Sequence, residues 1–364
     1  MKFSIIRSKF IEGLKYVQNI VGAKGSLPVL QNVLIEAKGR ELTMTTTDLD
    51  ISIMTKVECE VEEEGSTTLP VKLLFNSISK AAEGKLVVSV GENETATIVA
   101  GSAKFRLAGL PVADFPKLPF DEGSYVYEIE CQTLKEMLRK TSYAASQDDT
   151  RRTLKGVLMS FKEAKLTMVA TDGRRLALVE KEMELPQEAE TDIVLPSKTV
   201  QELQRSLGVE GTVKVMVQKT QICFEMGSTK IFSKLMDETY PNYVQVIPKS
   251  FKQSVVVERQ LLLDALDRAS VMTMDEAHST KLVFEENRLT VTSAANEVGS
   301  ASDEVPIKYA GEKLEIMFNP AYVMDPLKAI DDDEVKIELN DGHAPAVIRC
   351  SIPFLYVLMP LRVS

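Results

Sequence analysis

The sequence has little of what most enzymes use for catalysis. It contains no tryptophan and only two histidines, His278 and His343, so histidine-based acid–base chemistry or a His-rich metal site has little material. There is no GxSxG elbow, no GxxxxGKS/T phosphate loop and no GxGxxG fingerprint. These absences favour a protein without catalytic residues of its own, and they give no reason to expect a cofactor or a metal.

Cysteines are few, and long apolar runs are missing. The four cysteines lie 72, 92 and 127 residues apart, with no CxxC pair, so a zinc site is not indicated and buried free thiols are the simplest expectation: Cys59, Cys131, Cys223 and Cys350. No stretch approaches the roughly 18 apolar residues of a membrane span, and the first residues do not have the pattern of a signal peptide. We therefore expect a cytoplasmic protein in a reducing compartment.

Positive charge is also in deficit. The chain has 53 Asp and Glu against 43 Lys and Arg, a net charge of -10. On its face this balance argues against nucleic acid as a partner, because phosphate binding needs a basic surface.

The chain repeats itself about every 120 residues. Its length of 364 residues is two to three times the commonest domain size. Three markers recur in register, and each holds a similar offset from copy to copy: Leu42-Thr43-Met44-Thr45, Leu166-Thr167-Met168-Val169 and Leu289-Thr290-Val291-Thr292; Leu69-Pro70, Leu195-Pro196 and Asn319-Pro320; Phe115-Pro116, Tyr240-Pro241 and Met359-Pro360. We read three domains, over residues 1–122, 126–247 and 252–364.

Each copy has the same internal order. An amphipathic helix comes first, as in Leu262, Ala265, Leu266 and Ala269, whose spacing of three and four residues gives one apolar face. Short Val-, Ile- and Thr-rich strands follow, and then a second helix that begins near the marker proline. Two helices packed on about eight antiparallel strands predict an α+β domain.

Short motifs in a fixed order add a resemblance to a known family. They are similar to those of the bacterial replicative sliding clamps, the β subunits of DNA polymerase III, over essentially the full length: Met1-Lys2-Phe3, Leu27-Pro28-Val29-Leu30, Thr47-Asp48-Leu49, Ala113-Asp114-Phe115-Pro116, Ala170-Thr171-Asp172-Gly173-Arg174-Arg175-Leu176, Tyr240-Pro241-Asn242-Tyr243 and Met359-Pro360-Leu361-Arg362. The resemblance implies three clamp-type domains per chain and a head-to-tail homodimeric ring that encircles duplex DNA. It also implies a non-catalytic processivity function, with the polymerase III α subunit, the clamp loader and other clamp-motif proteins as partners through linear peptides.

Charge distribution removes the objection to DNA. The six expected helices, over residues 5–24, 70–81, 129–148, 196–207, 257–274 and 320–330, sum to +5 and leave -15 for the rest. An acidic chain can thus present basic helices to phosphate. By resemblance the DNA contacts are Lys24, Lys72, Gln147 and Lys198, and Arg151 and Arg152 are plausible additions. Whether the loop at 147–152 contacts bases or only phosphates stays open.

The resemblance also implies an apolar pocket for linear peptides between the second and third domains. Leu or Phe anchors would enter it, while Arg and Asn side chains would satisfy peptide backbone groups. Arg174 stands where relatives often carry histidine, which makes the rim more cationic. The pocket residues carried over are Leu154, Thr171, Gly173, Arg174, Arg175, Leu176, Pro241, Val246, Asn319, Tyr322, Val323, Met359, Pro360, Leu361 and Arg362.

Ring closure is expected to pair the edge strand near Ala103–Leu107 with an edge strand of the third domain of the other chain. Apolar side chains would support this contact: Phe75, Ile78, Phe105 and Leu107 on one side, with Val271 and Met272 on the other.

Two features have more than one interpretation. The run Asp331-Asp332-Asp333-Glu334 could hold a divalent metal in a nuclease, although contiguous carboxylates before a strand are usually a solvated loop. Thr171 to Arg175 could bind phosphate, but a turn is the simpler account, because Thr47-Asp48-Leu49-Asp50 repeats it in weaker form. A monomeric repeat scaffold that binds proteins without DNA is the other alternative.

Overall fold

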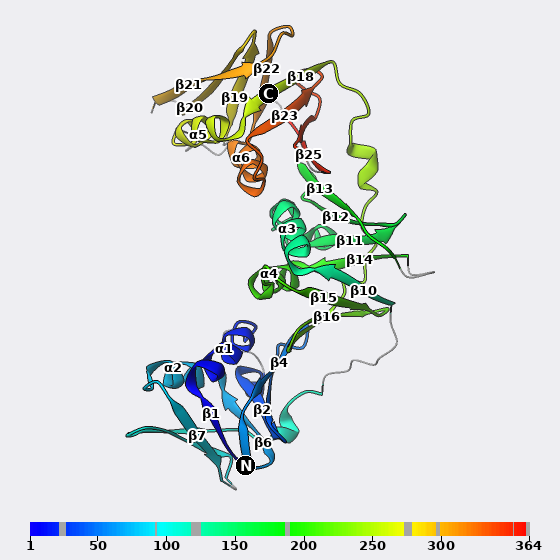
Figure 1. Cartoon of the computed structure of the whole chain (residues 1–364). Coiled ribbons are helices and arrows are strands. Elements are labelled where there is room, and N and C mark those ends of the chain that lie inside the picture. Colours follow the sequence, from blue (N-terminus) through cyan, green and yellow to red (C-terminus); the bar gives the residue numbers. More distant parts are fainter. Residues whose placement is uncertain are drawn as a thin grey trace. The chain divides into compact units, whose positions relative to one another are not determined.

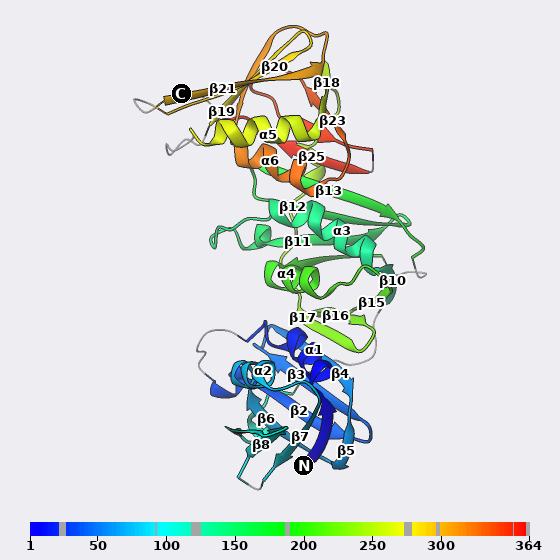
Figure 2. The same cartoon turned by 60° about the vertical axis from the view of Figure 1, so that its left-hand side comes forward.

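The computed structural model describes residues 1–21, 27–91, 93–117, 125–185, 190–272, 279–295, 299–351 and 353–361. It forms two compact units, one of residues 1–135 and 201–235 and the other of residues 136–200 and 236–364 (Figures 1 and 2). The chain passes from one unit to the other within the helices α3 (Cys131–Thr141) and α4 (Ser197–Ser206) and again between Leu235 and Met236.

The repeat is visible in the order of elements. Each third of the chain runs strand, helix, a set of strands, helix, three strands. The first third consists of β1 (Lys2–Ile6), α1 (Arg7–Val17), β2 (Asn32–Lys38), β3 (Glu41–Thr47), β4 (Ile51–Glu58), β5 (Glu60–Glu63), β6 (Gly65–Pro70), α2 (Val71–Lys80), β7 (Lys85–Val90), β8 (Thr95–Ala100) and β9 (Ala103–Ala108).

The other two thirds repeat this order. The middle third consists of β10 (Tyr125–Glu130), α3, β11 (Gly156–Lys162), β12 (Lys165–Thr171), β13 (Arg175–Glu182), β14 (Thr191–Pro196), α4, β15 (Thr212–Val217), β16 (Gln221–Met226) and β17 (Thr229–Lys234). The last third consists of β18 (Gln253–Glu258), α5 (Arg259–Ser270), β19 (Thr280–Glu285), β20 (Arg288–Ala295), β21 (Gly299–Lys308), β22 (Leu314–Phe318), α6 (Pro320–Ala329), β23 (Glu334–Leu339), β24 (Ala346–Arg349) and β25 (Phe354–Leu358).

Antiparallel strands of different thirds pair and so extend the sheets. The first unit contains a sheet of order β5-β1-β7-β8-β9 and one of order β10-β15-β16-β17-β4-β3-β2-β6, in which β17 pairs with β4. The second unit contains the sheet β14-β11-β12-β13-β25-β24-β23-β18-β21-β20-β19-β22, in which β13 pairs with β25. The predicted α+β fold of helices on antiparallel sheets is confirmed.

The helices pack through the faces that the periodicity predicts. In α5, Leu262, Ala265, Leu266 and Ala269 are all buried. Figures 1 and 2 show α5 and α6 side by side against their sheet. Each fully buried leucine contributes about 1.5–3 kcal/mol to folding.

Helix ends differ from the prediction. The apolar pattern from Ile6 to Val21 suggested one helix, but α1 ends at Val17, and Ile6 is 46% exposed before its first turn. Val21 is buried outside the helix, so its apolar character reflects burial rather than helical periodicity. Pro70 and Pro196 directly precede α2 and α4, whereas Pro320 is the first residue of α6; proline fits these positions because its missing N–H is not needed there.

The free cysteines bear out the expectation from their spacing. Cys59, Cys131 and Cys223 are buried and Cys350 is partly buried. Burial raises the pKa of Cys59 to about 11 and that of Cys223 to about 12. These two thiols therefore stay protonated at neutral pH and act as small apolar groups. No described helix is long and apolar enough to cross a membrane.

Candidate functional site

A tight turn joins β12 to β13 in the second unit. The Thr171 hydroxyl donates to the Arg175 carbonyl oxygen at 2.6 Å, and the Asp172 carboxylate accepts from the amides of Arg174 and Arg175 at 2.8 and 3.0 Å. Gly173 has φ +84°, a conformation that suits glycine. The segment is therefore an Asx-type turn, as the simpler interpretation predicted.

The first unit contains the same turn between β3 and β4. Thr47 donates to the Ile51 carbonyl oxygen at 3.2 Å, and Asp48 accepts from the amides of Asp50 and Ile51 at 3.0 and 2.8 Å. Leu49 takes the place of Gly173 with φ +81°. The repeat thus extends to individual hydrogen bonds.

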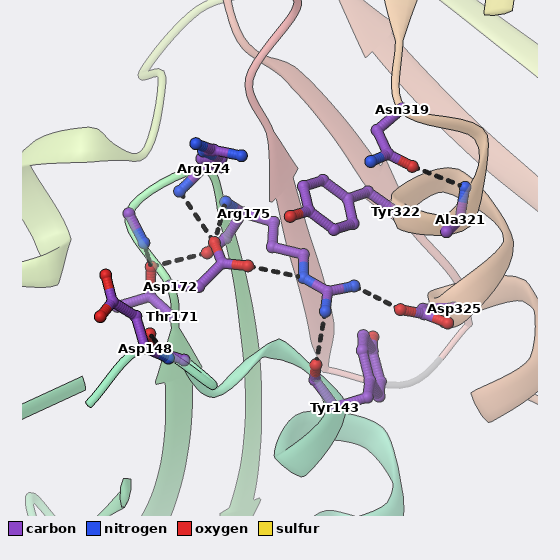
Figure 3. Close-up of polar contacts among 12 residues, drawn as sticks. Tyr143, Asp148, Thr171, Asp172, Arg174, Arg175, Asn319, Ala321, Tyr322 and Asp325 are labelled. Carbon is purple, nitrogen blue, oxygen red and sulfur yellow. Dashed lines mark hydrogen bonds and ion pairs between the residues drawn. The ribbon is translucent and has the colours of Figure 1, made fainter. Parts of the chain in front are cut away.

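Arg175 is the centre of a buried polar cluster beside its turn (Figure 3). Its side chain is 10% exposed; Nε donates to Asp172 Oδ2 at 3.1 Å, Nη2 donates to the Tyr143 carbonyl oxygen at 2.7 Å, and Nη1 pairs with Asp325 on α6. The guanidinium carbon lies 4.2 Å from the centroid of the Tyr322 ring. Two carboxylates and an aromatic face compensate the charge, as burial of a guanidinium requires.

A proline inside α6 links this cluster to β25. Pro326 has no N–H to donate to the Tyr322 carbonyl four residues earlier, and the Tyr356 hydroxyl donates to that carbonyl at 2.7 Å instead. Burial raises the pKa of Tyr356 well above its ordinary value, although Arg175 opposes the change. Tyr356 therefore remains a neutral donor.

Burial and neighbouring groups act in opposite directions on Arg175. Burial by itself lowers the pKa of this guanidinium, but Tyr356 and Asp325 outweigh it and hold the pKa above its ordinary value. Burial also raises the pKa of Tyr143. Arg175 thus stays charged and Tyr143 stays neutral at neutral pH, and the Arg175 guanidinium is held in an ion network by Asp172 and Asp325.

Apolar side chains lie next to the turn. Leu176 belongs to a buried cluster of β11 to β14, β24 and β25, against which Tyr240, Tyr243 and Ile247 of the following connection pack. Met359, one residue after β25, donates its amide to the Arg174 carbonyl at 2.9 Å. Its side chain is 42% exposed and that of Val246 is 50% exposed. Buried and exposed apolar side chains in these segments could accept apolar anchors of a ligand.

A pocket of about 350 Å³ adjoins the Arg175 cluster. Its lining is polar and charged, from the turn, from α6 and from the segment after α3: Ala145, Ser146, Gln147, Asp148, Arg151, Asp172, Arg174, Arg175 and Tyr322. Gln147 and Arg151 were predicted as DNA contacts, whereas Arg174, Arg175 and Tyr322 were predicted as pocket residues. The structure thus brings members of both sets to one cavity.

The other predicted pocket residues vary in exposure. Leu176 and Val323 are buried, each 2% exposed, and Thr171 is buried in its turn. Gly173, Arg174 and Pro241 are exposed, and Leu154, Pro360 and Leu361 are partly buried. Asn319 caps α6 by accepting from the Ala321 amide at 3.0 Å. Arg362 lies outside the described residues.

Sequence reasoning missed the residues that hold Arg175. Asp325 is 150 positions from Arg175, and Tyr356 lies still further along the chain, on β25. Tyr143 was assigned to the first helix of its repeat but lies in the 3-10 turn Ser142–Ala144 after α3. The one available signal in the sequence was Pro326 in the middle of α6. A proline there leaves one helix carbonyl without its usual donor, so another side chain has to bind it.

The predicted DNA contacts within the described chain are exposed. Lys72 lies on α2, Lys198 on α4, and Gln147, Arg151 and Arg152 on the segment between α3 and β11. Arg151 Nη1 donates to the Asp172 carbonyl at 2.9 Å and so connects this segment to the turn. Lys24 lies outside the described residues.

Charge is concentrated on the helices as expected. Within their observed bounds the six helices carry 13 Lys and Arg against 6 Asp and Glu, a net +7, which leaves -17 for the rest of the chain. The shorter helices are thus more basic than the ranges assumed from sequence, because several flanking acids fall outside them.

The predicted interface residues divide into two groups. Phe75, Phe105, Leu107 and Met272 are partly exposed and Val271 is 60% exposed. Ile78 is 0% exposed inside its own unit. In the single chain Ile78 faces the core from α2, and its place in the interface stays a prediction.

The acidic run has structural partners. Arg139 Nη1 donates to Asp331 Oδ1 at 3.0 Å, and Asp332 accepts from the Ser351 amide at 3.0 Å. The Asp333 carbonyl accepts from the Arg259 amide at 2.8 Å. No group of three or more potential ligands that could hold a metal ion is found in the described part of the chain.

Comparison with known proteins gives a consistent result along the whole chain. Models of the N-terminal, central and C-terminal domains of the DNA polymerase III β subunit match residues 1–119, 128–242 and 244–362. A β sliding clamp of Chlamydia muridarum is 34% identical over 362 residues and covers 100% of this chain and 99% of its own; one of Caulobacter vibrioides is 32% identical with full coverage of both. Among solved structures, the sliding clamp of Bartonella birtlesii bound to griselimycin has a TM-score of 0.95 at 34% identity, and that of Bacillus subtilis has 0.96 at 27%, each with complete coverage of both chains.

Proposed function

The chain belongs to the DNA polymerase III β-subunit family, and from this premise we propose that two copies close head to tail into a ring around duplex DNA and capture partner proteins through linear peptides. The protein is a DNA polymerase sliding clamp, a non-catalytic subunit of DNA polymerase III. Its family works with DNA and a DNA polymerase. The homodimer, the three domains at 1–122, 126–247 and 252–364, and the α subunit and clamp loader as partners are parts of the proposal.

The observation that carries the ring is the repeated strand pairing between thirds of the chain. β17 pairs with β4 and β25 pairs with β13. By the same repeat β9 corresponds to β17, and β21 corresponds to β4 and β13. The far edge of β9 has no described partner, nor has the far edge of β21 over residues 299–306. Pairing β9 of one chain with β21 of the next would remove both free edges.

The repeat also predicts the register of that pairing. In the first unit Ser52 lies opposite Phe232, and the corresponding residues of β21 and β9 are Ser300 and Arg106, since the Gly-Ser turn before β9 matches the Gly-Ser turn before β17. This register places Lys104 opposite Ser302 and diagonally across from Glu304, so opposite charges would lie near each other across the subunit boundary. Phe105 and Leu107 would supply apolar contacts, with Phe75, Val271 and Met272 beside them.

The basic helices support the DNA part of the proposal. A net +7 on helices in a chain of net -10 attracts phosphate without reading sequence. Lys24, Lys72, Gln147, Arg151, Arg152 and Lys198 are the contacts that we propose. The free cysteines suit work in the reducing cytoplasm.

The peptide pocket is proposed at the turn of Arg175. Exposed Met359 and Val246 would receive Leu or Phe anchors, and the ion network would hold Tyr322 and the turn rigid. Deletion of residues 359–362 should abolish binding of polymerase peptides while the dimer persists. Unchanged peptide affinity would refute this assignment.

Encirclement is tested on DNA of two topologies. Protein assembled by a clamp loader should remain on nicked circular DNA and should be lost from linear duplex by sliding off the ends. Equal retention on both would show that the ring model is wrong. Hydrolysis of duplex DNA with magnesium that is abolished by changes at 331–334 would favour the nuclease alternative instead.

A further inference from the structure

Two junctions in the chain share one backbone geometry. At the first, the Lys234 amide donates to the Asp50 carbonyl at 2.9 Å; at the second, the Met359 amide donates to the Arg174 carbonyl at 2.9 Å. Asp50 and Arg174 hold the same position in their turns, since each donates its amide to the aspartate two residues earlier. The strand registers agree, because Ser233 lies opposite Ile51 and Leu358 opposite Arg175.

The side chains at these matched positions differ in chemistry. At the first junction, Lys234 Nζ lies 3.0 Å from Asp50 Oδ1, so the two charges neutralise each other. At the second, Arg174 is exposed and forms no ion pair with any described residue, and its neighbour is the exposed Met359. The same backbone geometry thus carries an ion pair at the first junction. At the second it carries an arginine without a described ion-pair partner, beside an apolar side chain.

The charges around Arg174 are already compensated. In the adjoining pocket of about 350 Å³, Arg175 is held by Asp172 and Asp325, and Arg151 lies 3.9 Å from Asp148 and donates to the Asp172 carbonyl. Figure 3 shows the Arg175 side chain reaching toward Tyr143 and Asp325, whereas the Arg174 guanidinium lies away from this network and no interaction reaches it. Among the described residues that line this pocket, Arg174 is therefore the one cation without a carboxylate partner.

We propose that Arg174 is a specificity residue that pairs with a single carboxylate of the docking peptide, next to its apolar anchors. This inference rests on the proposed peptide pocket. A single cation beside an exposed methionine matches one acidic side chain flanked by apolar residues. A nucleic-acid strand is the competing occupant, because its affinity comes from many phosphates and the nearby Arg151 and Arg152 are proposed DNA contacts; the oligo-dT measurement below distinguishes the two.

The test uses the full-length protein and synthetic peptides. Fluorescein-labelled hexapeptides end in Leu-Phe, and a single Asp, Asn or Lys is stepped through the four preceding positions. Fluorescence anisotropy gives Kd for the wild type, Arg174→Gln and Arg174→Glu. Lys234→Gln is the matched control, since it removes a cation at the equivalent place of the first junction. Only main-chain atoms of Arg174 hold its turn, so these variants should fold.

We expect Asp at one position to bind about two- to fivefold more tightly than Asn, which is typical of an exposed ion pair. Arg174→Gln should remove this preference, Arg174→Glu should transfer it to the Lys peptide, and Lys234→Gln should leave it intact. A preference that is absent in the wild type or unchanged in Arg174→Gln would overturn the inference. Weaker binding of oligo-dT by Arg174→Gln with unchanged peptide selectivity would assign the cation to nucleic acid and also overturn it. Failure of every peptide to bind every variant would instead refute the pocket itself.

Discussion

The guanidinium carbon of Arg175 lies 4.2 Å from the centroid of the Tyr322 ring, so a cation from β13 is covered by an aromatic side chain of α6. The same guanidinium is bound by Asp172 and Asp325. Because the side chain is only 10% exposed, removal of either sign of charge leaves the other buried and unpaired.

Arg175→Ala is therefore expected to lower the free energy of unfolding by about 3–5 kcal/mol. The free energy of unfolding of Arg175→Lys should lie between those of the wild type and Arg175→Ala, because an ammonium keeps the charge but cannot reproduce the forked contacts to two carboxylates. Urea unfolding followed by circular dichroism measures both. Arg174→Ala is the control, with an expected change within about 0.5 kcal/mol for an exposed side chain. Equal stability of the two alanine variants would contradict the ion network.

Leu49 and Gly173 hold equivalent positions in the two repeated turns, and we expect substitutions there to change stability in opposite directions. Leu49 has φ +81°, which strains a residue with a Cβ, so Leu49→Gly should stabilise the protein by about 0.5–1 kcal/mol. Gly173→Ala should destabilise it by at least about 1 kcal/mol, because φ is +84° and an added Cβ would lie 2.8 Å from Arg151 Nη1. Paired urea titrations give both values. Changes of the same sign would show that backbone strain does not dominate these turns.

The buried ion pairs of Glu338 should make the protein less stable in acid. It is 8% exposed, with its carboxylate 2.7 Å from Lys336 Nζ and 2.9 Å from Arg349 Nε. Burial raises its pKa, but the bonds from Lys336 and Arg349 outweigh burial and lower the pKa below its ordinary value. The stabilisation is thus complete above the unfolded pKa of about 4.3 and is lost as pH falls through the folded value.

Glu338→Gln should cost about 1–2 kcal/mol at pH 7, and the difference from wild type should narrow at pH 3. Unfolding in urea at both pH values tests the sign. Glu334→Gln, which breaks the exposed pair with Lys308, is the control and should cost less than about 1 kcal/mol at pH 7. A difference that widens in acid would refute the assignment.

The ring interface predicts the behaviour of β9. Leu107→Glu places a charge where we expect apolar contact with β21, so dimer affinity should fall by at least about tenfold. Val271→Glu should act in the same way from the other side. Val209→Glu, at a position 68% exposed and outside the proposed interface, should leave the dimer unchanged. Sedimentation velocity over a range of concentrations distinguishes these outcomes, and a wild-type monomer at micromolar concentration would sink the ring model.

Local pattern predicted much of the site but not its centre. The marker phrases placed Thr171 to Leu176 in a turn and a strand, and that local structure is confirmed by hydrogen bonds within five residues. Asp325 and Tyr356 were not foreseen, since nothing near them in the sequence points to Arg175. The sequence could not show that Ile78 is buried within its own unit, because an apolar residue on an amphipathic helix looks the same whether its own sheet or a partner covers it.

The sequence by itself determined the threefold repeat, the apolar helix faces and the excess of positive charge on the helices. These depend on spacing, turn chemistry and composition within one copy, where neighbours along the chain are also neighbours in space. Tertiary structure alone decided that β17 joins β4, that β25 joins β13 and that Arg175 meets Asp325 across 150 residues. Such pairings depend on which strand edges lack hydrogen-bond partners and which charges lack counter-charges after each copy has folded. This is decided by the assembled chain and not by any one segment.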